Sequence, residues 1–235
     1  PIVRSTLSRI SGGAYNYKSP TDMGVNMAGY AIFDDEAVRR ASCQEIIRRF
    51  FAAKCAHRQG KGTEEAVEKI RMIMQQLEIT PHDRAVVDPA MEKSRRSGMP
   101  AAAIELPDGQ IVTGKASDLM SATSSVVLNA IKALTKIDDD LTLISPIILE
   151  PIVKLKTQIL NGRSTLLKLD DVLTALSISA ATNTLTDRAM AALPQLRDCE
   201  FHSTQMLHSG DEGTLRRLGL RVTCEAVYPG KDLFF

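Results

Sequence analysis

A short Pro-Asp-Gly turn lies between two β-prone runs, and this feature constrains the fold more than any other stretch of the chain. The run AAAIEL covers residues 101–106, QIVTG covers 110–114, and Pro107-Asp108-Gly109 joins them. Asp-Gly between two such runs is the usual short-range signal for a β-hairpin. The sequence therefore predicts an antiparallel pair of strands around which the remaining elements are arranged.

The segment before this hairpin is predicted to be mainly helical. Apolar residues recur at helical spacing, Thr80 and Asp83 form a capping-box pattern, and Gly98 provides a stop. The predicted helices cover residues 34–59, about 67–77 and 80–98. Residues 1–33 contain too many glycines for a helix, and we expect an ordered loop there.

Strands and helices alternate after the hairpin. The predicted helices cover residues 117–136, 146–160 with a kink at Pro151, a segment that begins at Asp170, 186–196 and 211–218. The predicted strands cover residues 141–145, 199–207 and 220–228. This alternation favours an α/β class, with a mixed sheet layered between helices. The predicted organisation is a loop plus helical subdomain over 1–98, followed by an α/β subdomain over 99–235.

Composition excludes several classes of function. The 235 residues carry 29 Lys+Arg against 28 Asp+Glu, a formal net charge of +1, so no global field attracts nucleic acid or an anionic membrane. No apolar run reaches the roughly 20 residues needed to span a bilayer. The 4 cysteines form no Cys-x-x-Cys, which favours a reducing, cytoplasmic setting. The start at Pro1-Ile2-Val3 predicts a processed chain or the trailing part of a longer one.

The stretch GQIVTGKA, residues 109–116, has the glycine and lysine spacing of a phosphate-binding P-loop. The motif ends in Ser or Thr, however, and this chain has Ala116, which cannot bind Mg²⁺ through a hydroxyl. β-branched residues between the glycines favour a strand. Two weaker interpretations remain open. Lys115, Ser117 and Asp118 hold an anion at the start of a helix, or Ser117 only caps that helix and Lys115 is solvated.

Several long blocks resemble the bacterial proteins grouped as domain of unknown function 1846. The blocks are residues 17–51, 101–134, 143–160, 175–183 and 199–229. The resemblance implies that this chain is the C-terminal half of a longer protein, and that the missing N-terminal half, with its own Gly-Ser-Gly-Lys stretch, is a partner. It also implies a three-layer arrangement similar to the cytidine-deaminase fold. Relatives often have Thr at the position of Ala116, so this departure weakens a phosphate role for the loop.

A fold likeness does not establish an activity. The zinc-deaminase signature is missing, because Ser203-Thr204 follows His202 and no Cys-x-x-Cys is present. No His-Glu-x-x-His occurs either, and we predict no metal site. Asp138-Asp139-Asp140 either binds a hard cation or forms a solvated turn.

Two polar stretches are candidate sites. The loop 19–29 places Thr21, Asp22 and Asn26 between glycines, which suits either a small polar ligand or a connector with local caps. In the strand CEFHST, Glu200, His202 and Thr204 share one face, either as an acid–base group or as a solvated face, with Glu225 a possible neighbour. Ser203 and Thr204 are also candidate ligand contacts, and Asp22, Glu200 and His202 are the candidate catalytic residues.

Two further patterns leave alternatives open. Cys199 and Cys224, both in predicted strands, form either a redox pair or buried free thiols. Four arginines, Arg39, Arg40, Arg48 and Arg49, give a predicted helix a basic face for an anion or for the missing half, or a solvated face.

Two hypotheses of function follow. The chain is part of a cytosolic enzyme or binding protein for a phosphorylated or nucleotide-like small molecule, with the cofactor unknown. Alternatively, it is a non-catalytic assembly module that packs on the N-terminal half or on a second subunit in a homo-oligomer. The substrate, the reaction and the oligomeric state do not follow from the sequence.

Overall fold

The computed structural model describes residues 35–162 and 164–229, and all structural statements below concern these residues. The chain divides into two compact units, residues 1–46 and 47–235. The second unit contains the sheet. Within the described ranges, no helix combines the length and apolarity that crossing a membrane requires.

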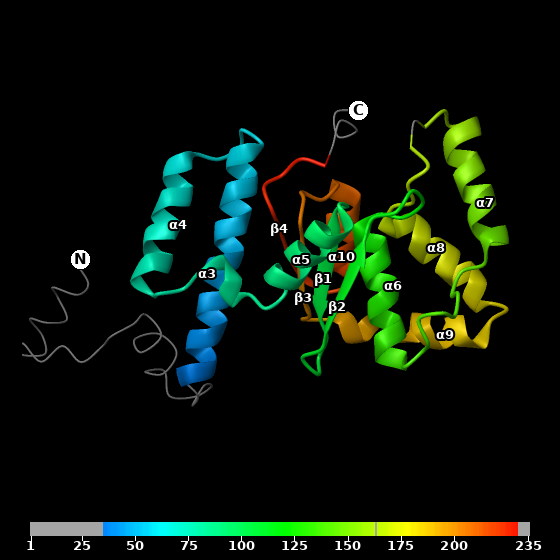
Figure 1. The fold of residues 1–235 in the computed structure, drawn as a ribbon, viewed down its shortest axis with the longest axis horizontal. Coiled ribbons are helices and arrows are strands. Elements are labelled where there is room, and N and C mark those ends of the chain that lie inside the picture. Colours follow the sequence, from blue (N-terminus) through cyan, green and yellow to red (C-terminus); the bar gives the residue numbers. More distant parts are fainter. Residues whose placement is uncertain (1–34, 163, 230–235) are drawn as a thin grey trace, which may run out of the picture. The chain divides into compact units, whose positions relative to one another are not determined.

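Eight α-helices and four strands are described, so the predicted mixed α/β class is confirmed (Figure 1). The helices are α3 (Asp35–Arg58), α4 (Glu64–Gln76), α5 (Val87–Ser97), α6 (Ala122–Thr135), α7 (Pro146–Lys154), α8 (Leu169–Ala180), α9 (Thr184–Ala191) and α10 (Ser209–Arg217). The strands are β1 (Ala101–Glu105), β2 (Ile111–Lys115), β3 (Glu200–Ser203) and β4 (Arg221–Cys224). Short turns of other helix types cover Pro81–Asp83, Leu155–Ile159 and Leu193–Leu196.

The four strands form one mixed sheet in the order β2-β1-β3-β4. The predicted hairpin is present, with β1 antiparallel to β2 and Gly109 at a φ of 84° in the turn. β1 is also antiparallel to β3, whereas β3 and β4 run parallel and pair His202 with Thr223. The last two strands therefore place residues from the end of the chain beside the hairpin.

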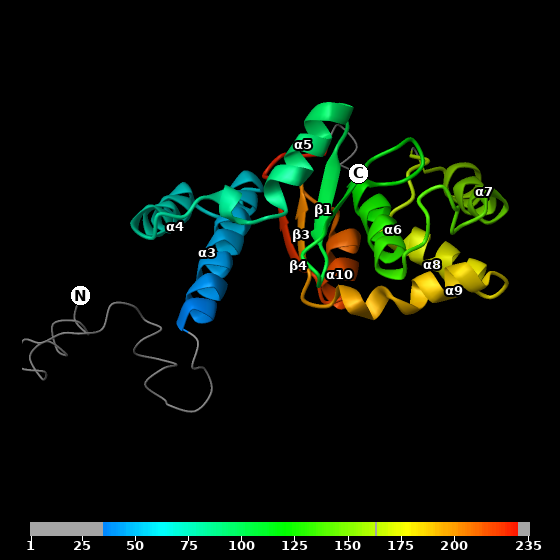
Figure 2. The same cartoon turned by 60° about the horizontal axis from the view of Figure 1, so that its bottom comes forward.

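Helices cover both faces of this sheet, as Figure 2 shows. On one face, Ala102, Ile104 and Phe201 pack into the main core. Residues of α6, α8 and α10 complete that core: Val126, Val127, Ala130, Ile131, Val172, Ala175, Leu176 and Leu215. On the other face, Ala103 packs with Val86 and Ala90 of the α5 region. The layers thus agree with the expected arrangement, while a likeness to the cytidine-deaminase fold stays a prediction.

The strand predicted over 141–145 is wrong. These residues form bends and irregular backbone, although Leu143 and Ile144 are buried in the main core. The backbone carbonyl of Leu143 accepts a hydrogen bond from the Thr186 hydroxyl at 2.7 Å. The apolar run is therefore buried by helix packing, and a helix side chain supplies a partner for the Leu143 carbonyl without a neighbouring strand.

Two helix starts lie later in the chain than the pattern indicated. The Thr80–Asp83 capping box is present, but it closes only a 3₁₀ turn, and α5 begins at Val87. Arg84 between them has an extended backbone (φ −95°, ψ 107°). This extension allows the Arg84 side chain to be fully buried against the sheet, a tertiary requirement that overrides the local signal.

The second late start concerns α6, which begins at Ala122 rather than at Ser117. Met120 forms a parallel bridge with Leu167, and the flanking N–H groups of Leu167 and Ser121 bond across it at 2.7 and 3.2 Å. This pairing needs extended backbone before the helix. The hydroxyl of Ser121 then caps α6 by accepting from the N–H of Ser124 at 3.1 Å.

The predicted helix over 146–160 is present in two parts. α7 runs to Lys154 with Pro151 inside it, and the next five residues form a π-helical turn. The change of geometry therefore falls about one turn beyond the proline.

Candidate functional site

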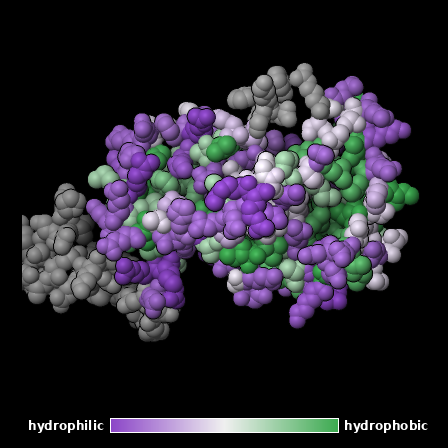
Figure 3. All heavy atoms as spheres, viewed as in Figure 1, coloured by the Kyte–Doolittle hydropathy of each residue, from purple (hydrophilic) through white to green (hydrophobic). Residues whose placement is uncertain are grey.

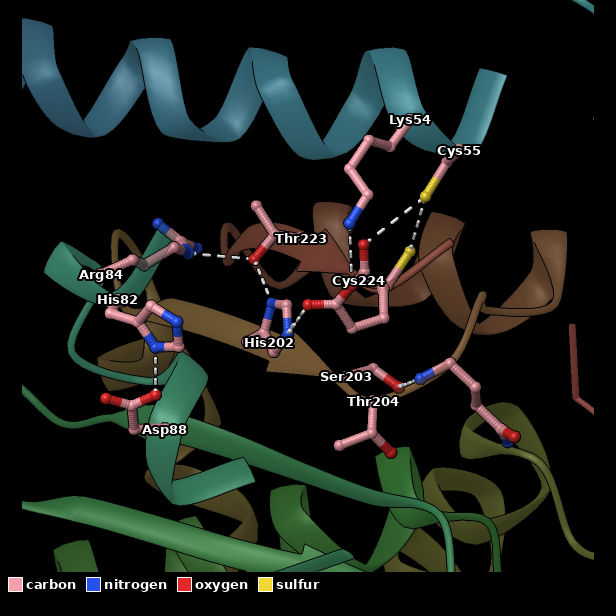
Figure 4. Close-up of polar contacts among 12 residues, drawn as sticks. Lys54, Cys55, His82, Arg84, Asp88, His202, Ser203, Thr204, Thr223 and Cys224 are labelled. Atoms are coloured by element: carbon pink, nitrogen blue, oxygen red, sulfur yellow. Dashed lines mark hydrogen bonds and ion pairs between the residues drawn. The ribbon is translucent and has the colours of Figure 1, made fainter. Parts of the chain in front are cut away.

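His202 lies at the centre of a polar cluster on the sheet face opposite the main core (Figure 4). Its side chain is fully buried, and its ring packs on Phe51 of α3 with centroids 4.8 Å apart. Nδ1 lies 2.9 Å from the Thr223 hydroxyl on the neighbouring strand. That hydroxyl also lies 3.0 Å from the carbonyl of Phe201, so strand pairing holds the ring in place.

The other ring nitrogen of His202 has no hydrogen-bond partner. Among the described residues, Nε2 of His202 is the buried side-chain atom left in this condition. A carboxylate oxygen of Glu225 lies 3.8 Å away, beyond hydrogen-bond distance. The second oxygen of Glu225 pairs with Nζ of Lys54 at 3.2 Å. A buried polar atom without a partner is rare in native folds, so this one marks the ring for attention as a candidate site.

The pKa of His202 is lowered to about 3, chiefly by burial and further by the charges of Arg84 and Lys54. The ring is therefore neutral near pH 7, with one nitrogen carrying a proton and the other a lone pair. A neutral imidazole can orient a ligand by accepting or donating a hydrogen bond. It cannot serve as a cationic proton donor at that pH.

This lowered pKa makes a testable contribution to stability. The ordinary pKa is 6.5, so below that value the unfolded chain binds a proton that the folded ring rejects, and stability is lost as the pH falls from 6.5 towards 3. Between pH 7 and 5 the free energy of unfolding should fall by about 2 kcal/mol more in the wild type than in His202→Gln. Urea unfolding of both chains at the two pH values measures this difference.

The glutamine variant is a matched comparison, because it stays neutral and can still bond to Thr223. All other titrating groups are shared, so their effects cancel in the difference between the two chains. Equal pH slopes would contradict a depressed pKa at His202.

Arg84 provides the second half of the cluster. Its guanidinium is fully buried and donates to the Thr223 hydroxyl at 2.9 Å and to the carbonyls of Phe201 and Arg221 at 3.1 and 2.7 Å. It also pairs with one oxygen of Glu200. Burial lowers the pKa of Arg84, and the Glu200 charge opposes that shift. The guanidinium thus joins β3 to β4 through side-chain and main-chain acceptors.

Glu200 and His202 share a face, as the alternation of the strand indicates, but they have different partners. The second oxygen of Glu200 accepts from Arg48 of α3 at 2.9 Å. The carboxylate nearest to His202 is that of Glu225, which confirms the neighbour expected from the last strand. An acid–base role for Glu200 and His202 together stays a prediction, and the contacts favour Glu225 as the partner of the ring.

Ser203 and Thr204 have structural contacts in this fold. The Ser203 hydroxyl is buried and accepts from the N–H of Gln205 at 3.3 Å. The Thr204 hydroxyl bonds to the N–H and the carbonyl of Ala101 at 3.0 and 3.1 Å. Both side chains bond to backbone groups near the end of β3, and neither belongs to the His202 cluster.

The Lys115–Asp118 stretch does not form an anion cradle. The N–H groups of Ala116 and Ser117 donate to the carbonyls of Pro100 and Met120 at 2.7 and 2.9 Å. The Ser117 hydroxyl accepts from the N–H groups of Leu119 and Met120 at 3.3 and 3.0 Å. Lys115 is exposed at the end of β2. Ligand binding by Lys115, Ser117 and Asp118 remains a prediction without geometric support.

Three predicted ligand contacts, Thr21, Asp22 and Asn26, lie outside the described residues. Among the described residues, no group of three or more His, Cys, Asp or Glu side chains could hold a metal ion. A hollow of about 410 Å³ lies over α5, lined by the charged side chains Asp88, Glu92, Arg95 and Arg96. Two carboxylates precede two guanidiniums along the helix here, and the hollow contains none of the polar groups around His202.

Of the two alternatives for Cys199 and Cys224, the redox pair is wrong, and both are free thiols with different neighbours. The thiol of Cys199 donates to the carbonyl of Gln195 at 3.6 Å, at the start of β3. Cys224 lies at the far end of the parallel strand, where its sulfur is 3.6 Å from that of Cys55 on α3. Parallel pairing separates a residue at the start of one strand from a residue at the end of the next.

Sequence reasoning missed Lys54, Cys55, Arg84 and Thr223. Each is separated by many residues from His202 along the chain or lies on another strand, and none belongs to a local motif. The signal that could have identified Thr223 is its place in a β-prone run whose neighbour carries a histidine.

Comparison with known proteins gives a family for these residues. The model described as "Domain of unknown function DUF1846, C-terminal" matches residues 82–234, and "Domain of unknown function DUF1846, N-terminal" matches residues 1–78. The chain therefore carries sequence of both domains. The expectation that it is the C-terminal half alone, with the N-terminal half as a missing partner, is wrong.

Curated relatives are named only as UPF0371 proteins. One from Clostridioides difficile (strain 630) is 46% identical over 243 residues, covering 100% of this chain and 48% of the relative. Another from Clostridium botulinum (strain Alaska E43 / Type E3) is also 46% identical, and one from Clostridium tetani (strain Massachusetts / E88) is 44% identical, with the same coverage. The chain spans about half the length of the curated relatives it matches.

Proposed function

This chain belongs to the DUF1846 family, and from that premise we propose that it forms part of a protein that binds or transforms a small phosphorylated or nucleotide-like molecule. The family description states no activity, so the support comes from the geometry around His202. The single observation that carries the proposal is the buried Nε2 atom without a partner.

A ligand group that donates a hydrogen bond would satisfy the lone pair of this neutral ring. The same position lies beside the Glu225 carboxylate, which can accept a hydroxyl or amino proton. Small polar molecules with hydroxyl groups, such as sugars and nucleosides, carry donors of this kind. The imidazole ring of His202 and the carboxylate of Glu225 would together bind the polar part of the ligand.

Lys54 supplies the group that suits an anion. Its side chain is one-third exposed, whereas that of Glu225 is 18% exposed and His202 is buried, so the three lie at successive depths. The ammonium also lies 5.5 and 5.8 Å from the ring centroids of Phe50 and Phe51. A phosphate that replaced Glu225 as the partner of Lys54 would free the carboxylate for the polar part of the ligand.

The proposal predicts a position-specific loss of affinity. For the nucleotide or sugar phosphate that binds, Lys54→Met should weaken binding by roughly 10-fold or more, since a charge-assisted hydrogen bond contributes about 1.5–3 kcal/mol. Methionine keeps an apolar stem over the phenylalanine rings. His202→Gln tests the buried nitrogen, and calorimetric titration after a thermal-shift screen gives the affinities.

Two control variants locate the site. Lys61→Met removes an exposed ammonium a short distance along the chain and should leave the affinity unchanged. Lys115→Ala tests the competing stretch. Loss of affinity in Lys115→Ala but not in Lys54→Met would contradict the placement at His202. Absence of binding by nucleotides and sugar phosphates to the wild-type chain would contradict the ligand class.

An exposed apolar surface favours the alternative, an assembly module. Ile147, Ile159 and Leu160, on α7 and just after it, are 75%, 65% and 67% exposed. Figure 3 shows hydrophobic surface on the side of the view where α7 and α8 lie. Such a surface can pack on a second subunit. Sedimentation that finds a compact monomer at all concentrations would count against this alternative and leaves the His202 proposal intact.

A further inference from the structure

Two thiols distant in the sequence meet beside the His202 cluster. Cys55 on α3 and Cys224 at the end of β4 are separated by 169 positions, and their sulfur atoms lie 3.6 Å apart. The thiol of Cys55 also donates to the carbonyl of Cys224 at 3.5 Å. Figure 4 shows the two side chains pointing toward each other from the helix and the strand. Both residues are partly exposed.

Neighbouring contacts keep the two segments together. Lys54 precedes Cys55 and Glu225 follows Cys224, and these two side chains pair at 3.2 Å. The hydroxyl of Tyr228 donates to the carbonyl of Arg58 at 2.8 Å. These contacts fix the end of α3 against the segment that follows β4. The thiols therefore meet as a consequence of the fold rather than by chance approach of mobile ends.

The electrostatic environment makes the two thiols unequal. The hydrogen bond with Cys224 lowers the pKa of Cys55; burial and the Glu225 carboxylate oppose this shift, and the Lys54 ammonium supports it. The same hydrogen bond and burial raise the pKa of Cys224. These directions favour Cys55 as the thiol that ionises first. The thiolate is the form that attacks a disulfide.

We propose that Cys55 and Cys224 form a reversible dithiol–disulfide site that reacts with small disulfides of the glutathione class. The Cys55 thiolate attacks one sulfur of glutathione disulfide, which forms a mixed disulfide and releases one glutathione thiolate. Cys224 then loses its proton and attacks the Cys55 sulfur, which forms the internal disulfide and releases the second glutathione. The protein loses two electrons and two protons, and glutathione disulfide becomes two glutathione molecules.

Forming this bond requires little rearrangement. A disulfide is about 2.05 Å long, so the sulfur atoms would approach each other by on the order of 1.5 Å. The product would join the end of α3 covalently to the end of β4, next to Lys54 and Glu225. It would close a long loop, and the midpoint of thermal unfolding should rise by on the order of 5 °C.

The experiment is exchange of the full chain with glutathione disulfide at pH 7.5 without oxygen, followed by non-reducing peptide mapping. The expected product is a single linked peptide that contains Cys55 and Cys224, reversed by reduced glutathione. Cys224→Ser should stop at the mixed disulfide on Cys55. In Cys55→Ser, modification of Cys224 should be at least about 10-fold slower, since burial still raises the pKa of its thiol.

A chain with both Cys43→Ser and Cys199→Ser is the matched control, and it should form the Cys55–Cys224 link at the wild-type rate. Three results would overturn the proposal: no linked peptide in the wild type, links shared equally with Cys43 or Cys199, or faster modification of Cys224 than of Cys55. The wild-type peptide map needs no substitution, so a variant that fails to fold does not remove the test.

Discussion

Replacing Arg84 with methionine is expected to lower the free energy of unfolding by about 3–5 kcal/mol, the range for removing one partner of a buried ion pair. The guanidinium has no exposed surface, and it donates to the Thr223 hydroxyl and to the carbonyls of Phe201 and Arg221. Methionine fills part of the volume but donates to none of these acceptors, and it removes the buried partner of Glu200. Denaturant unfolding of the wild type and the variant measures the loss.

Arg96→Met is the matched control. Its side chain is 77% exposed and pairs with Glu92 at 3.6 Å on the surface of α5, so the expected change is within about 0.5 kcal/mol. A double variant, Arg84→Met with Glu200→Gln, should lose less than the sum of the two single losses, because the two side chains contact each other. A loss below about 1 kcal/mol in Arg84→Met would contradict this account.

Gly114→Ala is expected to destabilise the fold by about 3 kcal/mol, the upper range for overpacking a core. A Cβ atom at this position would lie 2.4 Å from the backbone nitrogen of Val126 and 2.7 Å from its Cα. Both atoms belong to the backbone of α6, so neither can move away as a side chain would. The substitution must push α6 from β2, and denaturant unfolding measures the cost.

Gly213→Ala is the comparison for Gly114. Gly213 lies in α10, and a Cβ atom there meets no atom within 4 Å. Because alanine is the better helix former, this variant should be more stable than the wild type by about 0.5–1 kcal/mol. If Gly114→Ala were as stable as Gly213→Ala, the close approach of β2 and α6 would be contradicted.

Gly114 also answers the question raised by the P-loop spacing of residues 109–116. Gly109 has a positive φ in the hairpin turn, and Gly114 lies where the α6 backbone touches the strand. Each glycine therefore has a structural reason in this fold that does not involve phosphate. The spacing of the two glycines follows from the length of β2. The N–H groups of Ala116 and Ser117, after this strand, donate to carbonyls within the protein.

The sequence by itself determined the class of the fold and most of its elements. The Asp-Gly turn predicted the β1–β2 hairpin, and apolar periodicity predicted the helices, because turn chemistry and side-chain spacing are local properties. It also placed His202 on one strand face and Glu225 near it. Local signals failed at residues 141–145 and at the starts of α5 and α6. There, tertiary packing and a strand-like bridge determined the backbone conformation.

Only the tertiary structure decided which side chains meet. Arg84 reaches across β3 and β4, Lys54 approaches Glu225, and Cys55 rather than Cys199 lies beside Cys224. These contacts join residues more than 100 positions apart, so no local pattern in the sequence records them. Strand order, the parallel register of β3 and β4, and the packing of the second half of α3 bring them together, and these depend on how the whole core is buried.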